Sequence, residues 1–278
     1  MTRQPLEGAP VGTSAPACCG LTVWRDPPAA GPWNMAADEA LARTAEQSGR
    51  VLVRLYGWQP DAVSLGGFQP FAESEQQPEL TGWPIVRRPS GGGAIVHGSD
   101  LTYCLALPMQ HPWSRRPEDL YTAVHGALVD ELCHRGAAAA MVNADLAATV
   151  PADSFFCFNR RALGDVIITT AAVGAVAGGC KVLGSAQRRL AGVVLQHGSL
   201  LLRRHPSMGG AGSHAGLADL AAGVGDGSPE LVGCWLCRLA ERLGGPLKEE
   251  QGVSWAADDF DLPRRARWYA ADDWLRRR

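Results

Sequence analysis

The chain has 278 residues, of which 46% are hydrophobic and 19% are charged, and its formal net charge is −2. This balance is typical of a soluble globular protein and argues against a dedicated nucleic-acid binder, which would carry a basic excess. No stretch approaches 18 uncharged apolar residues, so we expect no membrane partner.

Residues 1–20 contain no apolar core of the signal-peptide type and are predicted to form a disordered lead-in, which favours a cytoplasmic protein. Residues 21–278 are predicted to form one domain, with a short C-terminal helix and tail from about residue 229. The eight cysteines do not indicate disulfides, because that inference applies to short secreted chains. Cys234 and Cys237 form a CxxC without a second pair of zinc ligands, so helix packing is favoured over a redox or metal role.

The first predicted element is a helix over residues 33–49, which Asn34 caps and Gly49 ends. Five short strand-like runs follow, at residues 51–58, 62–68, 84–89, 93–97 and 101–108.

A second helix is predicted over residues 117–136, ended by Gly136, and a β-rich block spans residues 164–202. A loop of small residues at 207–227 precedes a helix over residues 229–243 and a tail rich in arginine and tryptophan. Strands occur in runs and do not strictly alternate with helices. This order indicates an α+β fold with a mixed or antiparallel sheet flanked by helices.

Residues 87–97 read "RRPSGGGAIVH" and join two of the strand-like runs. Three consecutive glycines lose much backbone entropy on folding, so the loop is either a tight hairpin or a place where a ligand approaches the backbone. It lacks the ending of a triphosphate-binding loop. Arg87 and Arg88 add fixed positive charge beside it.

Three later motifs are ambiguous when each is taken alone. Lys181 in "CKVLGSAQRR" is either a surface side chain or a buried lysine, and burial would lower its pKa and let it act as a base. His197 in "LQHGSLLL" is more readily a hydrogen-bonded structural residue than a catalyst. Cys157 in "SFFCFNRR" is either a packed cysteine or a nucleophile.

Together the motifs resemble the lipoate–protein ligase A family, which shares its fold with biotin protein ligases and octanoyltransferases. The resemblance covers residues 33–202 and includes "NMAADEAL" and "RLYGWQPDAVSLGGFQ" upstream of the glycine loop. It implies an acyl pocket and an essential lysine, Lys181, that contacts the acyl carbonyl. The residues that it implies for the pocket are Arg88, Ser90, Gly91, Gly92, Gly93, His97, Gly184, Ser185 and His197.

Cys157 and Phe158 resemble the Cys–Phe pair of the LipM-type octanoyltransferases, and Cys157 lies 24 residues before the lysine. The resemblance implies that Cys157 takes an octanoyl group from acyl carrier protein. The group then passes to the acceptor lysine of a lipoyl domain, such as the glycine cleavage H protein. No ATP, other cofactor or metal is expected. Cys180 is the rival nucleophile, but a residue that directly precedes Lys181 on a strand would point to the opposite face.

Other functions stay open at this point. An ATP-dependent lipoate or octanoate ligase could use Arg88 at its phosphate. A lipoyl amidotransferase and a non-catalytic acyl-binding protein are further alternatives. The arginine pairs 160/161, 188/189 and 203/204 form either a docking surface for acidic acyl carriers or solvated strand ends.

Overall fold

The computed structural model describes residues 20–148, 154–169, 179–190, 192–221, 223–224, 227–250 and 260–278. Nearly all of the predicted lead-in, residues 1–19, lies outside these ranges. Within them, no helix combines the length and the apolar character that a membrane crossing requires.

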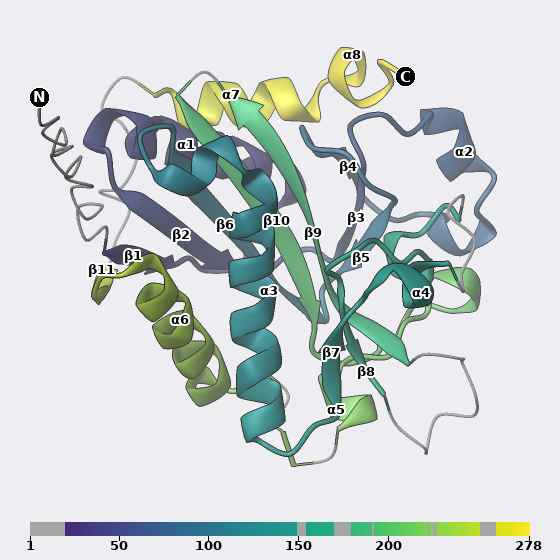
Figure 1. Cartoon of the computed structure of the whole chain (residues 1–278). Helices are drawn as coiled ribbons and strands as arrows, with labels where there is room; N and C mark the ends of the chain where they lie inside the picture. Colours follow the sequence, from purple (N-terminus) through teal and green to yellow (C-terminus); the bar gives the residue numbers. More distant parts are fainter. Residues whose placement is uncertain are drawn as a thin grey trace, which may run out of the picture.

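A mixed eight-stranded sheet forms the centre of the fold, in the order β11-β1-β2-β6-β10-β9-β8-β7 (Figure 1). β1 runs parallel to both β11 and β2, and all other neighbours in this sheet are antiparallel. β2 and β10 are buried along their whole length, because helices cover both faces of the sheet. The strands are β1 (Leu21–Arg25), β2 (Val51–Tyr56), β6 (Asp100–Pro108), β7 (Ala139–Met141), β8 (Val166–Ile168), β9 (Cys180–Leu190), β10 (Val193–Leu201) and β11 (Leu247–Glu250).

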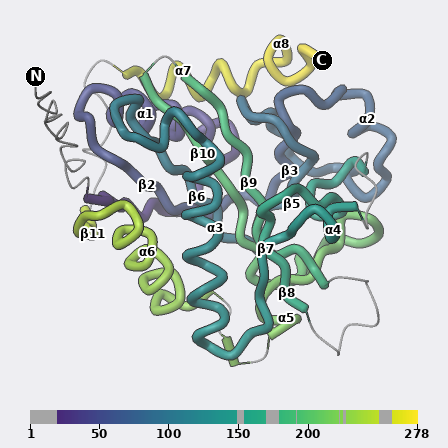
Figure 2. The backbone as a smooth tube through the Cα atoms, viewed as in Figure 1, coloured from purple at the N-terminus to yellow at the C-terminus, as the bar shows by residue number. Residues whose placement is uncertain are grey.

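Helices α3 (Pro117–His134) and α6 (Pro229–Leu243) cover one face, and their apolar sides enclose the larger core cluster. Helices α1 (Gly31–Ser48) and α7 (Leu262–Ala270) pack on each other over the other face. Figure 2 shows the C-terminal segment returning over the sheet, so that α7 lies beside α1 and α8 (Asp272–Leu275) lies against β4.

A second sheet of three strands, in the order β4-β3-β5, adjoins the first and carries the glycine loop. Its strands are β3 (Ala62–Leu65), β4 (Ile85–Arg87) and β5 (Ile95–His97). β4 and β5 both pair with β3 and not with each other. The loop between them therefore crosses from one edge of this sheet to the other, and the hairpin alternative is wrong.

The α+β class with a mixed sheet flanked by helices is confirmed. The predicted helices at 33–49, 117–136 and 229–243 correspond to α1, α3 and α6, and Gly49 is the left-handed C-cap of α1. The role predicted for Asn34 is wrong, because α1 begins at Gly31 and Ala30 is its N-cap. Asn34 lies inside the helix, where its amide donates to the carbonyls of Ala29 and Gly57.

Several elements were not expected from the sequence. The strands β1, β7 and β11 are short, and the predicted C-terminal tail contains α7 and α8. The short helices α2 (Phe71–Glu75), α4 (Ala144–Ala147) and α5 (Leu217–Leu220) lie in segments that otherwise read as loops. In all of these the apolar pattern is too short to show a period, and tertiary pairing decides the structure.

Candidate active site

Cys157 and Lys181 lie side by side in the folded chain. Cys157 begins the short 3₁₀ turn η3 (Cys157–Asn159), and its backbone N–H donates to the carbonyl of Ala94 over 2.8 Å. Lys181 comes from the start of β9, and its Nζ is 3.6 Å from the Cys157 Sγ and 3.3 Å from the Cys157 carbonyl oxygen. An ammonium group at this distance can stabilise negative charge that develops on the sulfur during a reaction.

Asp165 completes this cluster and was missed by the sequence reasoning. Its Oδ2 lies 2.8 Å from the Lys181 Nζ, and both side chains are buried. The Tyr121 hydroxyl donates to the Oδ1 over 2.9 Å, and the backbone N–H of Ala162 donates to the Oδ2 over 2.7 Å. The available signal was an acidic residue directly before the apolar run "VII" of β8.

Lys181 is held as a cation. Burial acts to lower its pKa, but the charges of Cys157 and Asp165 outweigh burial, and the pKa is raised. The expectation of a lowered pKa is wrong, because the sequence did not reveal the groups whose negative charge offsets burial. The geometry fits a lysine that stabilises negative charge on the sulfur and on an acyl oxygen, and not a neutral base.

The guanidinium of Arg88 shapes the glycine loop from inside. It donates to the carbonyl and hydroxyl oxygens of Ser64, and to the carbonyls of Gly91 and Gly93 over 3.1 Å and 2.8 Å. Burial lowers the pKa of Arg88 to about 10, so the side chain stays charged at neutral pH. The Arg87 guanidinium likewise donates hydrogen bonds to the backbone carbonyls of Leu275, Gly66 and Gln69.

The loop needs glycine at two positions for different reasons. Gly92 has a φ of +97°, which side-chain-bearing residues rarely adopt. A Cβ on Gly93 would lie 2.8 Å from the Cys157 backbone N and 2.9 Å from the Phe155 carbonyl oxygen. Backbone atoms cannot yield as a flexible side chain can, so the loop lies directly against the backbone that presents the Cys157 thiol.

A narrow cavity of about 30 Å³ lies beside this cluster, between the glycine loop, β9 and β10. This space is smaller than an acyl chain, so we expect wall residues to move when a chain enters. Met35, whose side chain is unbranched and flexible, is one wall residue that can do so. Eight of the eleven predicted site residues line the cavity: Arg88, Gly91, Gly92, His97, Cys157, Gly184, Ser185 and His197.

The other three predicted residues lie next to these. Ser90 is hydrogen-bonded to His197, Gly93 supports Cys157, and Lys181 passes over Gly184, where an added Cβ would lie 2.5 Å from its Cε. Cys180, the rival nucleophile, packs partly against the larger core cluster.

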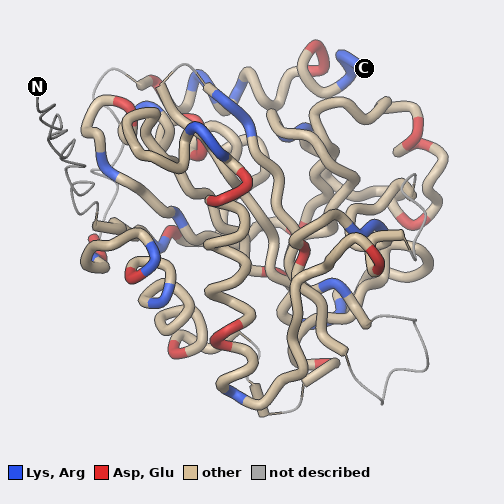
Figure 3. Tube along the Cα trace, in the orientation of Figure 1, with Lys and Arg blue, Asp and Glu red and all other residues tan. Residues whose placement is uncertain are grey.

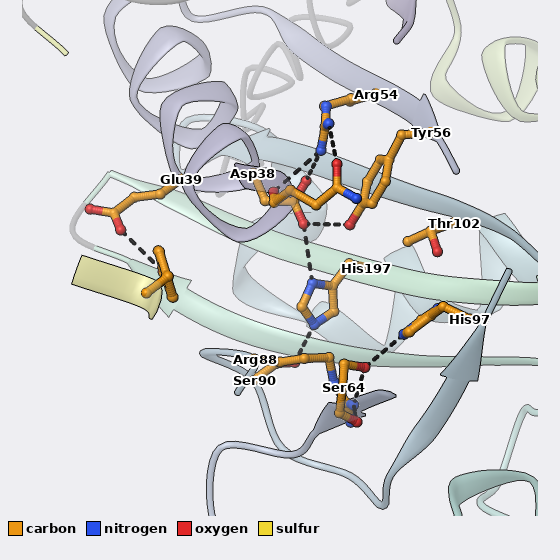
Figure 4. A network of polar contacts seen from close by, with 12 residues as sticks. Asp38, Glu39, Arg54, Tyr56, Ser64, Arg88, Ser90, His97, Thr102 and His197 are labelled. Carbon is orange, nitrogen blue, oxygen red and sulfur yellow. Dashed lines mark hydrogen bonds and ion pairs between the residues drawn. The ribbon is translucent and has the colours of Figure 1, made fainter. Parts of the chain in front are cut away.

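His197 is held between two polar groups, as Figure 4 shows. Its Nε2 is hydrogen-bonded to the Ser90 hydroxyl, and its Nδ1 lies 3.6 Å from the Asp38 Oδ2. Asp38 is fully buried, and it also accepts hydrogen bonds from Arg54 and Tyr56 over 2.9 Å and 2.8 Å. The sequence expectation of a hydrogen-bonded structural histidine therefore fits this ring, which also lines the cavity.

His97 also lines the cavity, and its contacts hold its ring in the neutral form. His97 stacks on Trp58, donates to Asp100 over 2.9 Å and accepts from the Ser64 hydroxyl. Burial lowers its pKa, although Asp100 acts in the opposite direction.

His125 was not predicted. Its Nδ1 donates to the Gly164 carbonyl, and its Nε2 lies 2.6 Å from the hydroxyl of Ser185, which the Tyr103 hydroxyl also contacts at 2.6 Å. This network fixes Ser185 at the cavity wall. In the part of the chain that the structure describes, no group of three or more His, Cys, Asp or Glu side chains is arranged to hold a metal ion.

The sequence and the fold both have known counterparts. Residues 31–208 match the lipoyl protein ligase A/B catalytic domain family. The octanoyltransferase LipM of Symbiobacterium thermophilum is 36% identical over 179 residues, which cover 62% of this chain and 61% of the relative. The LipM of Kyrpidia tusciae is 34% identical over 63% of each chain. The chain thus spans less than two thirds of the length of these relatives.

Among solved structures, a bipartite lipoate protein ligase from Thermoplasma acidophilum matches with a TM-score of 0.63 and 19% identity, over 93% of this chain and 96% of the other. A lipoate-protein ligase A bound with ATP matches with a TM-score of 0.62 and 22% identity, over 93% of this chain and 98% of the other. At these identities the likeness concerns the fold alone.

Proposed function

Because the chain belongs to the lipoyl protein ligase A/B catalytic domain family, we propose that it is an octanoyltransferase that works through a thioester on Cys157. In this proposal the donor is an octanoyl thioester on acyl carrier protein. The acceptor is the lysine of a lipoyl domain, such as that of the glycine cleavage H protein. Residues 21–278 act as one catalytic domain in the cytoplasm.

The first step is transfer from one sulfur to another. The Cys157 thiolate attacks the thioester carbonyl carbon, a C–S bond forms to Cys157, and the C–S bond to the carrier breaks. The carrier sulfur leaves as a thiolate and takes a proton from solvent. The Lys181 ammonium, held by Asp165, stabilises the oxyanion that forms during the attack.

The second step forms the amide. The neutral amine of the acceptor lysine attacks the acyl carbon on Cys157, and the C–S bond to Cys157 breaks. The amine loses a proton to solvent and the Cys157 sulfur leaves as a thiolate, so the site returns to its starting state. The step is downhill because an amide is more stable than a thioester.

One observation carries this proposal: the 3.6 Å approach of the Lys181 Nζ to the Cys157 Sγ at the edge of the apolar cavity. A cysteine that served only to pack the core would not need a buried ammonium beside its sulfur. Names of the relatives, all octanoyltransferases, support the same chemistry.

The ATP-dependent ligase is a less favoured candidate. Such an enzyme would need free cationic groups for a nucleotide phosphate on the inner side of the glycine loop, where the loop lines the cavity. Arg87 and Arg88 instead donate to backbone carbonyls of the loop and its neighbours.

The test is to incubate the protein with octanoyl-[acyl carrier protein] and to weigh it intact. We expect one octanoyl adduct on the wild type and on Cys180→Ser, and none on Cys157→Ser. An adduct that survives in Cys157→Ser would overturn the assignment of the nucleophile. Lipoyl-domain modification from free octanoate and ATP, without any carrier protein, would favour the ligase.

A further inference from the structure

Three arginines from two distant segments gather on the outer side of the glycine loop. Arg188 of β9 donates from Nη1 to the Pro89 carbonyl over 2.7 Å. Arg277 donates from Nη2 to the Gly67 carbonyl over 3.0 Å. Arg278 lies next to Arg277, and burial together with the charges of Arg188 and Arg278 lowers the pKa of Arg277. Arg277 therefore lies close enough to both Arg188 and Arg278 for their positive charges to act on it.

This group carries positive charge that the fold does not neutralise. Within the described ranges none of the three arginines forms an ion pair, whereas the neighbouring Arg276 pairs with Glu75 over 3.2 Å. The buried Arg87 adds a fourth positive charge to this group. It lies close to the others, because the charges of Arg277 and Arg278, after burial, lower its pKa. Figure 3 shows blue segments at the end of β9, along α7, after α8 and on β4, on one side of the molecule, with the red acidic residues of α8 beside them.

An exposed aromatic ring stands in the same place. Phe68 is 70% exposed, and the Arg278 guanidinium lies 6.0 Å from the centre of its ring. The ring also borders Gly91, where an added Cβ would lie 3.7 Å from it. Gly91 lines the cavity and the adjacent Gly92 is exposed. The arginines and Phe68, called here the arginine face, thus lie where the cavity wall reaches the surface.

We propose that the arginine face is the docking site for the acidic carrier protein that delivers the acyl thioester. This inference rests on the proposed function and names the partner surface of the same site. Arg277 and Arg278 lie outside residues 31–208, so the family match does not cover the C-terminal part of this surface.

The chemistry of the donor fits this face better than that of the acceptor. A pantetheine arm is joined to its carrier by a phosphodiester, so the donor presents acidic side chains and a fixed phosphate. The planar fork of arginine suits both groups. An acceptor domain must bring a lysine, whose cationic form four arginine charges would repel. An apolar anchor ringed by charge is also a common centre of a protein interface.

The test compares two donors and two kinds of variant. Arg278→Glu reverses one charge without removing a hydrogen bond of the loop, and Arg277→Gln keeps a donor for the Gly67 carbonyl. The control is Arg242→Glu, on α6, where the arginine pairs with Asp130. Acylation of Cys157 is followed by intact mass, with octanoyl-carrier protein or with octanoyl-pantetheine, which has neither the protein nor the phosphate. Binding of the unacylated holo-carrier is measured by calorimetry.

We expect the double variant Arg277→Gln/Arg278→Glu to weaken carrier binding about tenfold or more and to flatten its salt dependence. Its acylation by octanoyl-pantetheine should stay within about twofold of the wild type, as should both reactions of the control. Unchanged carrier binding, or an equal loss with both donors, would overturn the docking proposal and leave the proposed function standing. Weaker binding of a lipoyl domain, with carrier binding intact, would assign the face to the acceptor instead. If the wild type takes no octanoyl group from either donor, the proposed function itself fails and this inference falls with it.

Discussion

The Lys181 Nζ lies 3.6 Å from the Cys157 Sγ, although 24 residues separate the two in the sequence. The Cys157 backbone is fixed by the carbonyl of Ala94, directly before β5, and the lysine of β9 is fixed by the carboxylate of Asp165, directly before β8. Each partner is thus held by a different sheet. The approach depends on how the small sheet is docked on the large one.

Asp165→Asn tests the role of the carboxylate as a positioning residue. Asparagine keeps the shape but removes the charge that raises the pKa of Lys181, so the ammonium should be lost at a lower pH. We expect acylation by octanoyl-pantetheine to slow about 10- to 100-fold and the high-pH limb of its pH–rate profile to move to lower pH. Asp130→Asn, in an exposed ion pair, should change neither. A slower rate with an unmoved limb would indicate a structural role only.

Lys181→Met tests the ammonium itself. Methionine fills similar space without charge, so it no longer stabilises negative charge on the reacting Cys157 sulfur. We expect alkylation of Cys157 by iodoacetamide at pH 7 to slow about tenfold or more. A tenfold change corresponds to a loss of about 1.4 kcal/mol in the stabilisation of charge on the sulfur. Peptide mapping separates this reaction from alkylation of the exposed Cys234 and Cys237, whose rates should not change. Equal reactivity of Cys157 in both proteins would contradict the role of Lys181.

Gly93→Ala tests the contact between the glycine loop and the nucleophile. The new Cβ meets the backbone at Cys157 and Phe155, which must shift, so we expect a loss of about 1–3 kcal/mol in the free energy of unfolding. Octanoyl adduct formation should slow at the same time. Gly233→Ala is the matched control: no atom lies within 4 Å of its Cβ, and α6 should gain about 0.5–1 kcal/mol. Urea unfolding measures both variants, and a neutral Gly93→Ala would show that the loop is not packed on this backbone.

The sequence predicted the principal helices and most central strands, because these depend on local pattern, and the eleven residues that it proposed for the site lie together in the fold. Asp165 was missed, since its importance comes from a partner that lies 16 residues away on another strand. The path of the glycine loop could not be predicted from the sequence either, because the strand order in the small sheet is set by long-range pairing. Arg87 and Arg88 were recognised as charges, but their use on backbone carbonyls depends on loops that meet only in the folded chain.

His125 predicts a specific loss of stability in mild acid. Its ring is buried, and burial lowers its pKa from an ordinary value near 6.5 to about 4. The unfolded chain therefore binds a proton near pH 6.5, and the folded chain binds one only near pH 4. Unfolding takes up a proton in this window, so the free energy of unfolding falls as the pH falls, by up to about 3 kcal/mol from this group.

His125→Asn removes that dependence, because asparagine does not titrate and can still donate to the Gly164 carbonyl. The variant should be less stable than the wild type above pH 6.5, where it lacks the bond to Ser185. The difference should narrow as the pH falls from 6.5 to 4, as measured by urea unfolding at each pH. His134→Asn, at an exposed histidine on α3, should follow the wild-type curve. Parallel curves for His125→Asn and the wild type would mean that the buried imidazole is already charged in the folded chain.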